Sequence, residues 1–177
     1  MKNTLSILIL TLVLSLTACQ KEESPVTNDT TGQSATPAFA GTYDLEVVTD
    51  SIGADGIWQS QEERDQETGT TTAPMRGTLT ITATDDAGHY HLLGILLLGT
   101  SQTPVTYYDT DAHLDADRRL VIENSTMTFP SGLTGHLTFG TATYGSPSFS
   151  FRSEMSVVIS GTDCGYIFTN NCTKRAE

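Results

Sequence analysis

The stretch SFSFRSEMSVVIS, at residues 148–160, alternates apolar side chains with serine or charged side chains. Successive side chains of a β-strand point to opposite faces, so this alternation predicts a strand with one buried and one solvated face. The same period recurs at residues 41–49 and 77–84, where threonine and carboxylate side chains fill the alternate positions. Threonine suits a solvated strand face, because its branched Cβ favours extended backbone and its hydroxyl stays in water. The sequence therefore predicts an all-β domain.

Shorter apolar segments and turn signals extend this pattern along the chain. Further strands are expected at residues 57–60, 89–98, 105–108, 119–123 and 136–144. Clusters of Gly, Pro, Asp and Ser predict turns at residues 85–88, 101–104, 130–132 and 145–147. Residues 61–67 are polar, and we expect a loop there rather than a turn of helix. About eight short antiparallel strands predict a single up-and-down β-barrel, with a two-sheet β-sandwich as the alternative.

Strand parity assigns the side chains that face the interior of this barrel. A small closed barrel holds one apolar or amphipathic ligand at its open end, so inward side chains are also candidate ligand contacts. The predicted ligand-lining residues are Tyr43, Leu45, Val47, Leu79, Ile81, Phe149, Phe151 and Met155.

Residues 92–98 read LLGILLL and place apolar side chains on both faces of one strand. One face should fill the core, and the other needs a cover from the same chain, a partner protein or a membrane. Cover from the same chain is the preferred interpretation. An exposed patch at Leu96 and Leu98 over a solid core would favour a protein partner.

Residues 1–18 predict a signal peptide, because Lys2 precedes an apolar run at residues 5–16 that is too short to span a bilayer comfortably. The run ends in LTAC at residues 16–19, which resembles the lipobox of bacterial lipoproteins. That resemblance implies cleavage before Cys19 and attachment of lipid, palmitate included, to this residue. Residues 20–24, QKEES, resemble the surface-export signal of Bacteroidetes lipoproteins.

These resemblances imply an outer-membrane lipoprotein that is anchored through Cys19 and exposed at the cell surface, with the periplasmic face as the alternative. Residues 19–37 are rich in Thr, Ser and Pro, and predict a flexible tether between the lipid and a barrel domain at residues 38–177. Within that domain, FAGTY at residues 39–43 resembles the Gly-x-aromatic opening of lipocalin-like (calycin) barrels in Bacteroidetes lipoproteins. The resemblance implies that Tyr43 closes the barrel floor.

Two further modifications are expected in an exported protein. With Cys19 lipidated, Cys164 and Cys172 remain, and an oxidising compartment predicts a structural disulfide between them that closes a terminal hairpin. The triplets at residues 29–31 and 50–52 resemble the O-glycosylation site of the same phylum, which implies Thr30 and Ser51 as acceptors. Ser51 is expected just after the first strand, where a plain turn is the alternative.

The acidic run at residues 109–117 carries four carboxylates that suit a calcium ion, namely Asp109, Asp111, Asp115 and Asp117. The run lacks the glycine and the glutamate that an EF-hand loop has at its sixth and twelfth positions. A solvated acidic loop between strands is therefore the preferred interpretation, and no metal or other cofactor is expected. His89 and His91 point to one face of a strand, where they are expected to decorate the barrel wall.

The net charge and the absence of known catalytic motifs restrict the classes of function that the sequence suggests. The 177 residues include 9 Lys+Arg and 21 Asp+Glu, a net charge of −12, which argues against nucleic acid or anionic lipid as a partner. Nucleophile-elbow, Ser-x-x-Lys, Walker and dinucleotide-binding motifs are absent from the sequence. We therefore expect a non-catalytic surface protein that binds a small apolar or amphipathic ligand. The alternatives are a solid-core lipoprotein that binds a protein partner and, third, a hydrolase with a carboxylate or metal site.

Overall fold

The computed structural model describes residues 39–145 and 147–176, which belong to one compact unit. Its elements, in chain order, are β1 (Gly41–Ala54), β2 (Ile57–Ser60), α2 (Gln61–Thr68), β3 (Met75–Ala83), β4 (His89–Leu98), β5 (Thr103–Leu114), β6 (Leu120–Ile122), β7 (Ser125–Thr128), β8 (Thr134–Phe139), β9 (Ser148–Ile159) and β10 (Thr162–Lys174). The signal peptide, the lipidation site Cys19, the tether and the glycosylation candidate Thr30 lie outside the described residues.

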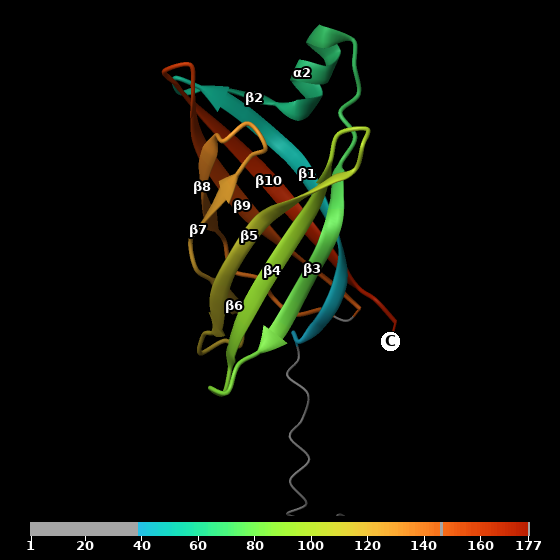
Figure 1. The fold of residues 1–177 in the computed structure, drawn as a ribbon, viewed down its shortest axis with the longest axis vertical. Helices are drawn as coiled ribbons and strands as arrows, with labels where there is room; N and C mark the ends of the chain where they lie inside the picture. Colours follow the sequence, from blue (N-terminus) through green and yellow to red (C-terminus); the bar gives the residue numbers. More distant parts are fainter. Residues whose placement is uncertain (1–38, 146, 177) are drawn as a thin grey trace, which may run out of the picture. The chain divides into compact units, whose positions relative to one another are not determined.

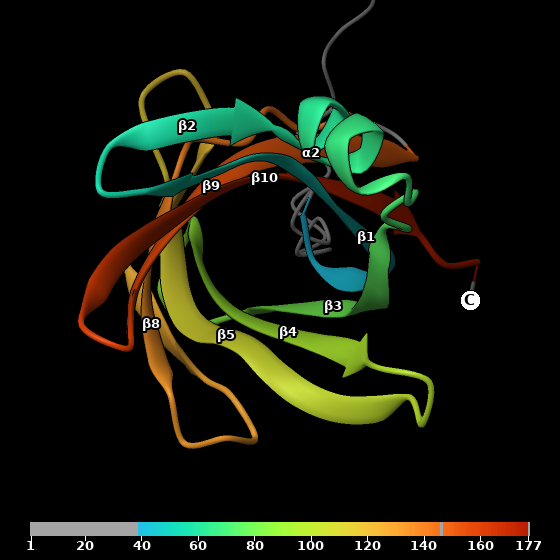
Figure 2. The same ribbon diagram turned by 90° about the horizontal axis from the view of Figure 1, so that it is seen from above.

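The ten described strands form one antiparallel sheet in the order β6-β5-β4-β3-β1-β10-β9-β8-β7, and β2 pairs with the far end of β1. The sheet curls into a barrel-like shape (Figures 1 and 2). The first and last strands pair along most of their length, from Tyr43 opposite Lys174 to Ala54 opposite Cys164. The prediction of an all-β, up-and-down barrel is thereby confirmed, and one continuous sheet replaces the two that a sandwich needs.

The two ends of the sheet meet along a seam that isolated hydrogen bonds hold together. Ser125, the first residue of β7, lies beside β5, and its hydroxyl donates to the carbonyl of Asp109 at 3.4 Å. Leu120 and Ala142 add an isolated antiparallel bridge across the same seam.

Several strands are longer than the sequence predicts. Residues 109–114 belong to β5, so the expected acidic loop is wrong for this part, and only Asp115 and Asp117 lie in the turn that follows. Ser51 also lies within a strand, at a bulge in β1 between β10 and β2, and not after the strand as expected. In β5 the carboxylates of Asp109 and Asp111 are exposed while Tyr108, Thr110 and Ala112 are buried, which is the alternation of a half-buried strand.

The predicted disulfide is wrong, because Cys164 and Cys172 lie on the same strand, β10, as free cysteines. Eight residues of extended strand place them roughly 26 Å apart at about 3.3 Å per residue. A disulfide needs a Cα–Cα separation of about 4.4–6.8 Å. Residues 162–174 form one long strand in place of the expected terminal hairpin.

The loop expected at residues 61–67 is a helix, α2. Ser60 and Glu63 form a capping box, in which each side chain bonds to the backbone N–H of the other, and Gly69 ends the helix in the left-handed conformation with φ of 66°. These hydrogen bonds from the backbone and side chain of Ser60 lower the pKa of Glu63. Because α2 has no buried residue, it shows no apolar stripe in the sequence.

Aromatic side chains seal one end of the barrel. Phe39 is buried with its ring centroid 5.1 Å from that of Tyr144 and 5.3 Å from that of Phe149, both edge to face. The hydroxyl of Tyr43 donates to the carbonyl of Phe39 at 2.8 Å, and the Tyr43 ring lies 5.1 Å from Phe149. The chain enters the barrel at this floor, at the opposite end from α2 (Figure 1).

Candidate functional site

A pocket of about 380 Å³ occupies the end of the barrel at which α2 lies. Its apolar walls come from the six strands β1, β3, β4, β7, β9 and β10, and from the loop that follows β7. These wall residues are Ile52, Met75, Leu96, Leu98, Met127, Phe129, Leu133, Met155, Val157, Ile159 and Phe168. Five polar side chains also line the pocket, namely Thr49, Gln61, Thr72, Tyr107 and Tyr166. The barrel thus has a sealed aromatic floor at one end and a mainly apolar pocket at the other.

Arg64 is the one charged side chain among the described residues that line this pocket. It projects from α2 and is partly buried. None of the ion pairs among the described residues involves its guanidinium. Burial raises the pKa of Tyr166, a wall residue, and the positive charge of Arg64 acts against that rise. Arg64 therefore places beside the pocket wall a positive charge that forms no ion pair among the described residues.

Hydrogen bonds around Asp65 hold α2 against the segment that leads into β3. Asp65 accepts from the backbone N–H and the hydroxyl of Thr72, both at 2.7 Å, and from the side-chain amide of Gln61 at 2.6 Å. Gln61 donates in addition to the hydroxyl of Thr72 at 2.8 Å. Gln61 and Thr72 both line the pocket, so this network fixes one side of its mouth.

A second polar network lies inside the barrel, behind Tyr107. The Tyr107 and Ser153 hydroxyls are 3.0 Å apart, and the side-chain amide of Asn170 donates to Ser153 at 2.8 Å and to the carbonyl of Phe151 at 3.3 Å. The Asn170 side-chain oxygen and the Tyr108 hydroxyl are buried without a partner among the described residues. Burial raises the pKa of Tyr107, which stays neutral at physiological pH. Ser153 was not predicted as an inward residue, although it continues the alternation of Phe149 and Phe151.

All eight predicted ligand-lining residues are buried, with exposed fractions between 0 and 6%. Strand parity thus predicts their burial correctly. Only Met155 among them lines the pocket, however, and the other seven fill the floor and the lower core. Val157 and Ile159 continue the alternation of Met155 into the pocket. The lining residues on α2 and in the loops carry no such pattern, because their contacts form between segments far apart in sequence.

One face of the apolar run of β4 fills the core, as expected. Leu96 is buried and Leu98 is partly buried, and both line the pocket, so no exposed patch forms at these two positions. The alternate side chains Leu93, Ile95 and Leu97 lie on the other face of the strand, and Leu97 is 38% exposed. Thr80, Thr78 and Arg76 lie opposite them on β3. These three side chains, the outer stripe of β4, are therefore flanked by polar residues of their own sheet.

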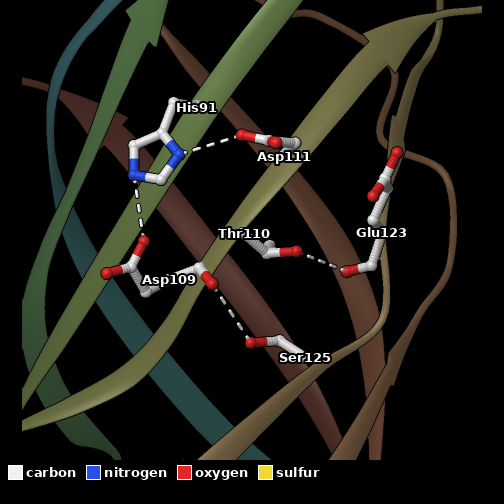
Figure 3. Close-up of polar contacts among 6 residues, drawn as sticks. All are labelled: His91, Asp109, Thr110, Asp111, Glu123 and Ser125. Carbon is white, nitrogen blue, oxygen red and sulfur yellow. Dashed lines mark hydrogen bonds and ion pairs between the residues drawn. The ribbon is translucent and has the colours of Figure 1, made fainter.

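The four calcium candidates lie in two separate groups. Figure 3 shows the first, in which the ring nitrogens of His91 on β4 each lie 3.0 Å from a carboxylate of β5, Nε2 from Asp109 and Nδ1 from Asp111. Asp115 and Asp117 instead pair with Arg119, at 2.8 and 3.1 Å. Hydrogen bonds from Arg119, first from its backbone, lower the pKa of Asp115. Residues 39–145 and 147–176 contain no group of three or more His, Cys, Asp or Glu that could hold a metal ion.

Comparison with family models and with curated proteins identifies no relative of this chain. No family model matches the chain, and no curated protein gives a significant match. None of the helices in the described part of the chain has the length and apolar character needed to cross a membrane. The fold and the pocket together define an all-β, barrel-like protein that is sealed at one end and hollow at the other.

Proposed function

We propose that the protein is a non-catalytic binding module that takes one small apolar or amphipathic ligand in the pocket beside α2. The observation that carries this proposal is the apolar pocket of about 380 Å³ at the end of the barrel opposite the aromatic floor. Ligand sites in proteins are mostly apolar concavities of about 300–1,000 Å³ with a few polar groups. The pocket has this composition, and its volume falls in the lower part of that range.

The same pocket lacks the groups that hydrolysis needs. None of the described residues that line it is Asp, Glu, His or Cys. General acid–base catalysis relies mainly on such side chains, and a hydroxyl nucleophile needs a neighbouring base to activate it. A binding role accounts for the lining residues better than a hydrolase does.

Extraction of the purified protein tests this proposal. The described strands pair with one another in one sheet, and a chain that begins at Gln20 contains all of them and omits the proposed lipid. We expect mass spectrometry of its organic extract to reveal a small apolar or amphipathic molecule in stoichiometric amount. The variant Leu98→Trp fills the pocket and should lose this molecule, whereas Leu97→Trp, on the outer face of the same strand, should keep it. Equal amounts of co-purified ligand in both variants would contradict the proposal.

The proposal includes attachment to the outer membrane through lipid on Cys19, with the barrel at the cell surface. The lipobox at residues 16–19 supports this attachment. Phe39, the first described residue, is packed into the floor, at the end of the barrel away from the pocket. Radiolabelled palmitate should enter the wild type but not Cys19→Ala, which should also leave the membrane fraction. If the barrel is at the cell surface, protease added to intact cells should digest it. Resistance of the barrel to this protease would indicate the periplasmic face.

A protein-interaction role is the second candidate function. The outer stripe of Leu93, Ile95 and Leu97 on β4 favours it, because apolar side chains on a solvated face commonly mark a contact surface. Leu97→Asp should abolish such an interaction while leaving ligand extraction unchanged. Co-purification of a partner that survives Leu97→Asp would argue against this surface.

A further inference from the structure

We infer that the pocket takes a single-chain amphiphile with an anionic head group, whose head pairs with Arg64 at the mouth while its apolar chain enters the barrel. This inference rests on the proposed function, since it names the class of ligand for the same pocket. It follows from the charges on α2, from the chemistry of the walls and from the volume of the pocket.

The carboxylates of α2 are all occupied by partners other than Arg64. Glu63 bonds to Ser60, Asp65 bonds to Thr72 and Gln61, Glu62 accepts from Gln66 at 3.3 Å, and Glu67 accepts from Gln59 at 3.2 Å. The helix therefore has four acidic residues and one basic residue, yet its arginine forms no ion pair with any of them. An arginine on an acidic helix ordinarily pairs with a carboxylate three or four positions away. Here the carboxylate of Glu67, three positions on, bonds to Gln59 instead.

Arg64 lies where its positive charge faces the occupant of the pocket. Arg64 lines the pocket, whereas Glu62, Glu63 and Glu67 do not, and neither does Asp65. A chain with a net charge of −12 thus presents one cation, and no anion among its described lining residues, to whatever occupies the pocket. The planar guanidinium binds carboxylate, sulfonate and phosphate groups through two parallel N–H donors. An anionic head group is therefore the chemistry that Arg64 matches.

The deeper part of the pocket matches an apolar chain. Met127, Met155 and Phe168 are buried wall residues, and methionine adapts to chains of variable shape. The polar group among them, the Tyr107 hydroxyl, is already hydrogen-bonded to Ser153. A charged head group would find no counter-charge there, so the ligand enters chain first. A volume of about 380 Å³, low in the usual range for ligand sites, favours one short chain over a two-chain lipid.

Two ligands that share an apolar chain but differ in the charge of the head group distinguish the contribution of the head-group contact from that of the apolar contact. Decanoate is an anion at pH 8, and decanol is its uncharged counterpart. Both are titrated against the chain that begins at Gln20, loaded with the neutral fluorescent probe N-phenyl-1-naphthylamine. We expect decanoate to displace the probe with a Kd about tenfold lower than that of decanol, because a charge-assisted hydrogen bond to Arg64 strengthens binding of the anion by about that factor. Arg64→Gln should remove this preference and leave the Kd for decanol within about twofold.

Arg76→Gln is the matched control, because Arg76 lies outside the pocket and pairs with Glu46 at 3.6 Å. It removes the same formal charge from the chain and should preserve the tenfold preference. If decanoate and decanol bind equally well to the wild type, or if Arg64→Gln keeps the preference, the head-group contact is refuted while the proposed binding function stands. Tighter binding of decyltrimethylammonium than of decanoate would also refute it. If neither the probe nor any ligand binds to folded protein, both the inference and the proposed function are wrong.

Discussion

The carboxylate of Asp65 accepts two hydrogen bonds from Thr72, one from the backbone N–H and one from the hydroxyl, each 2.7 Å long. These bonds join α2 to the segment that enters β3 and so fix one side of the pocket mouth. No buried apolar residue of α2 contributes to this attachment. The placement of Arg64, one residue before Asp65, thus depends on a polar contact at the surface.

Removal of this contact should loosen α2. In Asp65→Ala, Thr72 and Gln61 lose their shared acceptor, and local opening of the helix becomes more frequent. We expect trypsin to cleave after Arg64 several-fold faster in this variant than in the wild type, with little change in the urea midpoint of the barrel. Glu62→Ala, on the exposed face of the same helix, serves as the control. An unchanged cleavage rate in Asp65→Ala would show that other contacts hold the helix.

Acid should loosen the same attachment. Hydrogen bonds from Thr72, first from its backbone and then from its hydroxyl, lower the pKa of Asp65 below its usual value of 3.8. A carboxyl with a lowered folded-state pKa contributes stability above its unfolded-state pKa and loses it as the pH falls through the folded value. Hydrogen-exchange protection of residues 61–72 should therefore hold at pH 5 and fall below about pH 3.8. Asp65→Asn, which does not titrate, should lack this transition. Its persistence in that variant would assign the transition to another group.

The two barrel cysteines should react as separate thiols. Burial raises the pKa of Cys172 to about 12, so its reactive thiolate is scarce at pH 8, whereas Cys164 is only partly buried. In the chain that begins at Gln20, without reductant, we expect iodoacetamide to alkylate Cys164 first and both cysteines only after denaturation. Intact mass spectrometry counts the adducts. An intact mass two hydrogens below that of the reduced chain, together with no alkylation after denaturation, would show that Cys164 and Cys172 do form a disulfide.

The internal polar network should contribute to stability. Ser153→Ala leaves Tyr107 and Asn170 without their shared partner, which costs about 1–3 kcal/mol for buried polar groups that lose a hydrogen bond. Urea unfolding measures this loss. In the double variant Ser153→Ala/Tyr107→Phe, the cost should be smaller than the sum of the two single costs, because the phenol no longer needs a partner. Strict additivity would mean that Tyr107 and Ser153 do not interact.

Side-chain alternation predicts the core well, because strand parity is a local property. Tyr43, Leu45 and Phe149 are buried as their positions require. The same local reasoning cannot detect α2, which has no fully buried residue and lacks an apolar period. The capping box formed by Ser60 and Glu63, with Gly69 after the last turn, was the available signal.

The pocket was predictable only in general terms. A barrel with an open end follows from the strand pattern, but part of the lining at that end comes from α2, β7 and loops whose contacts are set by the closed fold. Arg64 carries no sequence signal that separates it from the other charged residues of the segment. The disulfide failed for a related reason, since the sequence does not show that Cys164 and Cys172 share one strand and are held apart by it.

Binding of one apolar or amphipathic molecule in the pocket beside α2 is the property on which the proposed function depends. A titration of the chain that begins at Gln20 with N-phenyl-1-naphthylamine measures it, since the probe becomes fluorescent in an apolar site. We expect saturable binding of one probe per chain, loss of that binding in Leu98→Trp, and retention in Leu97→Trp. Absence of saturable binding to the folded wild type, or equal binding by both variants, would contradict the proposed function.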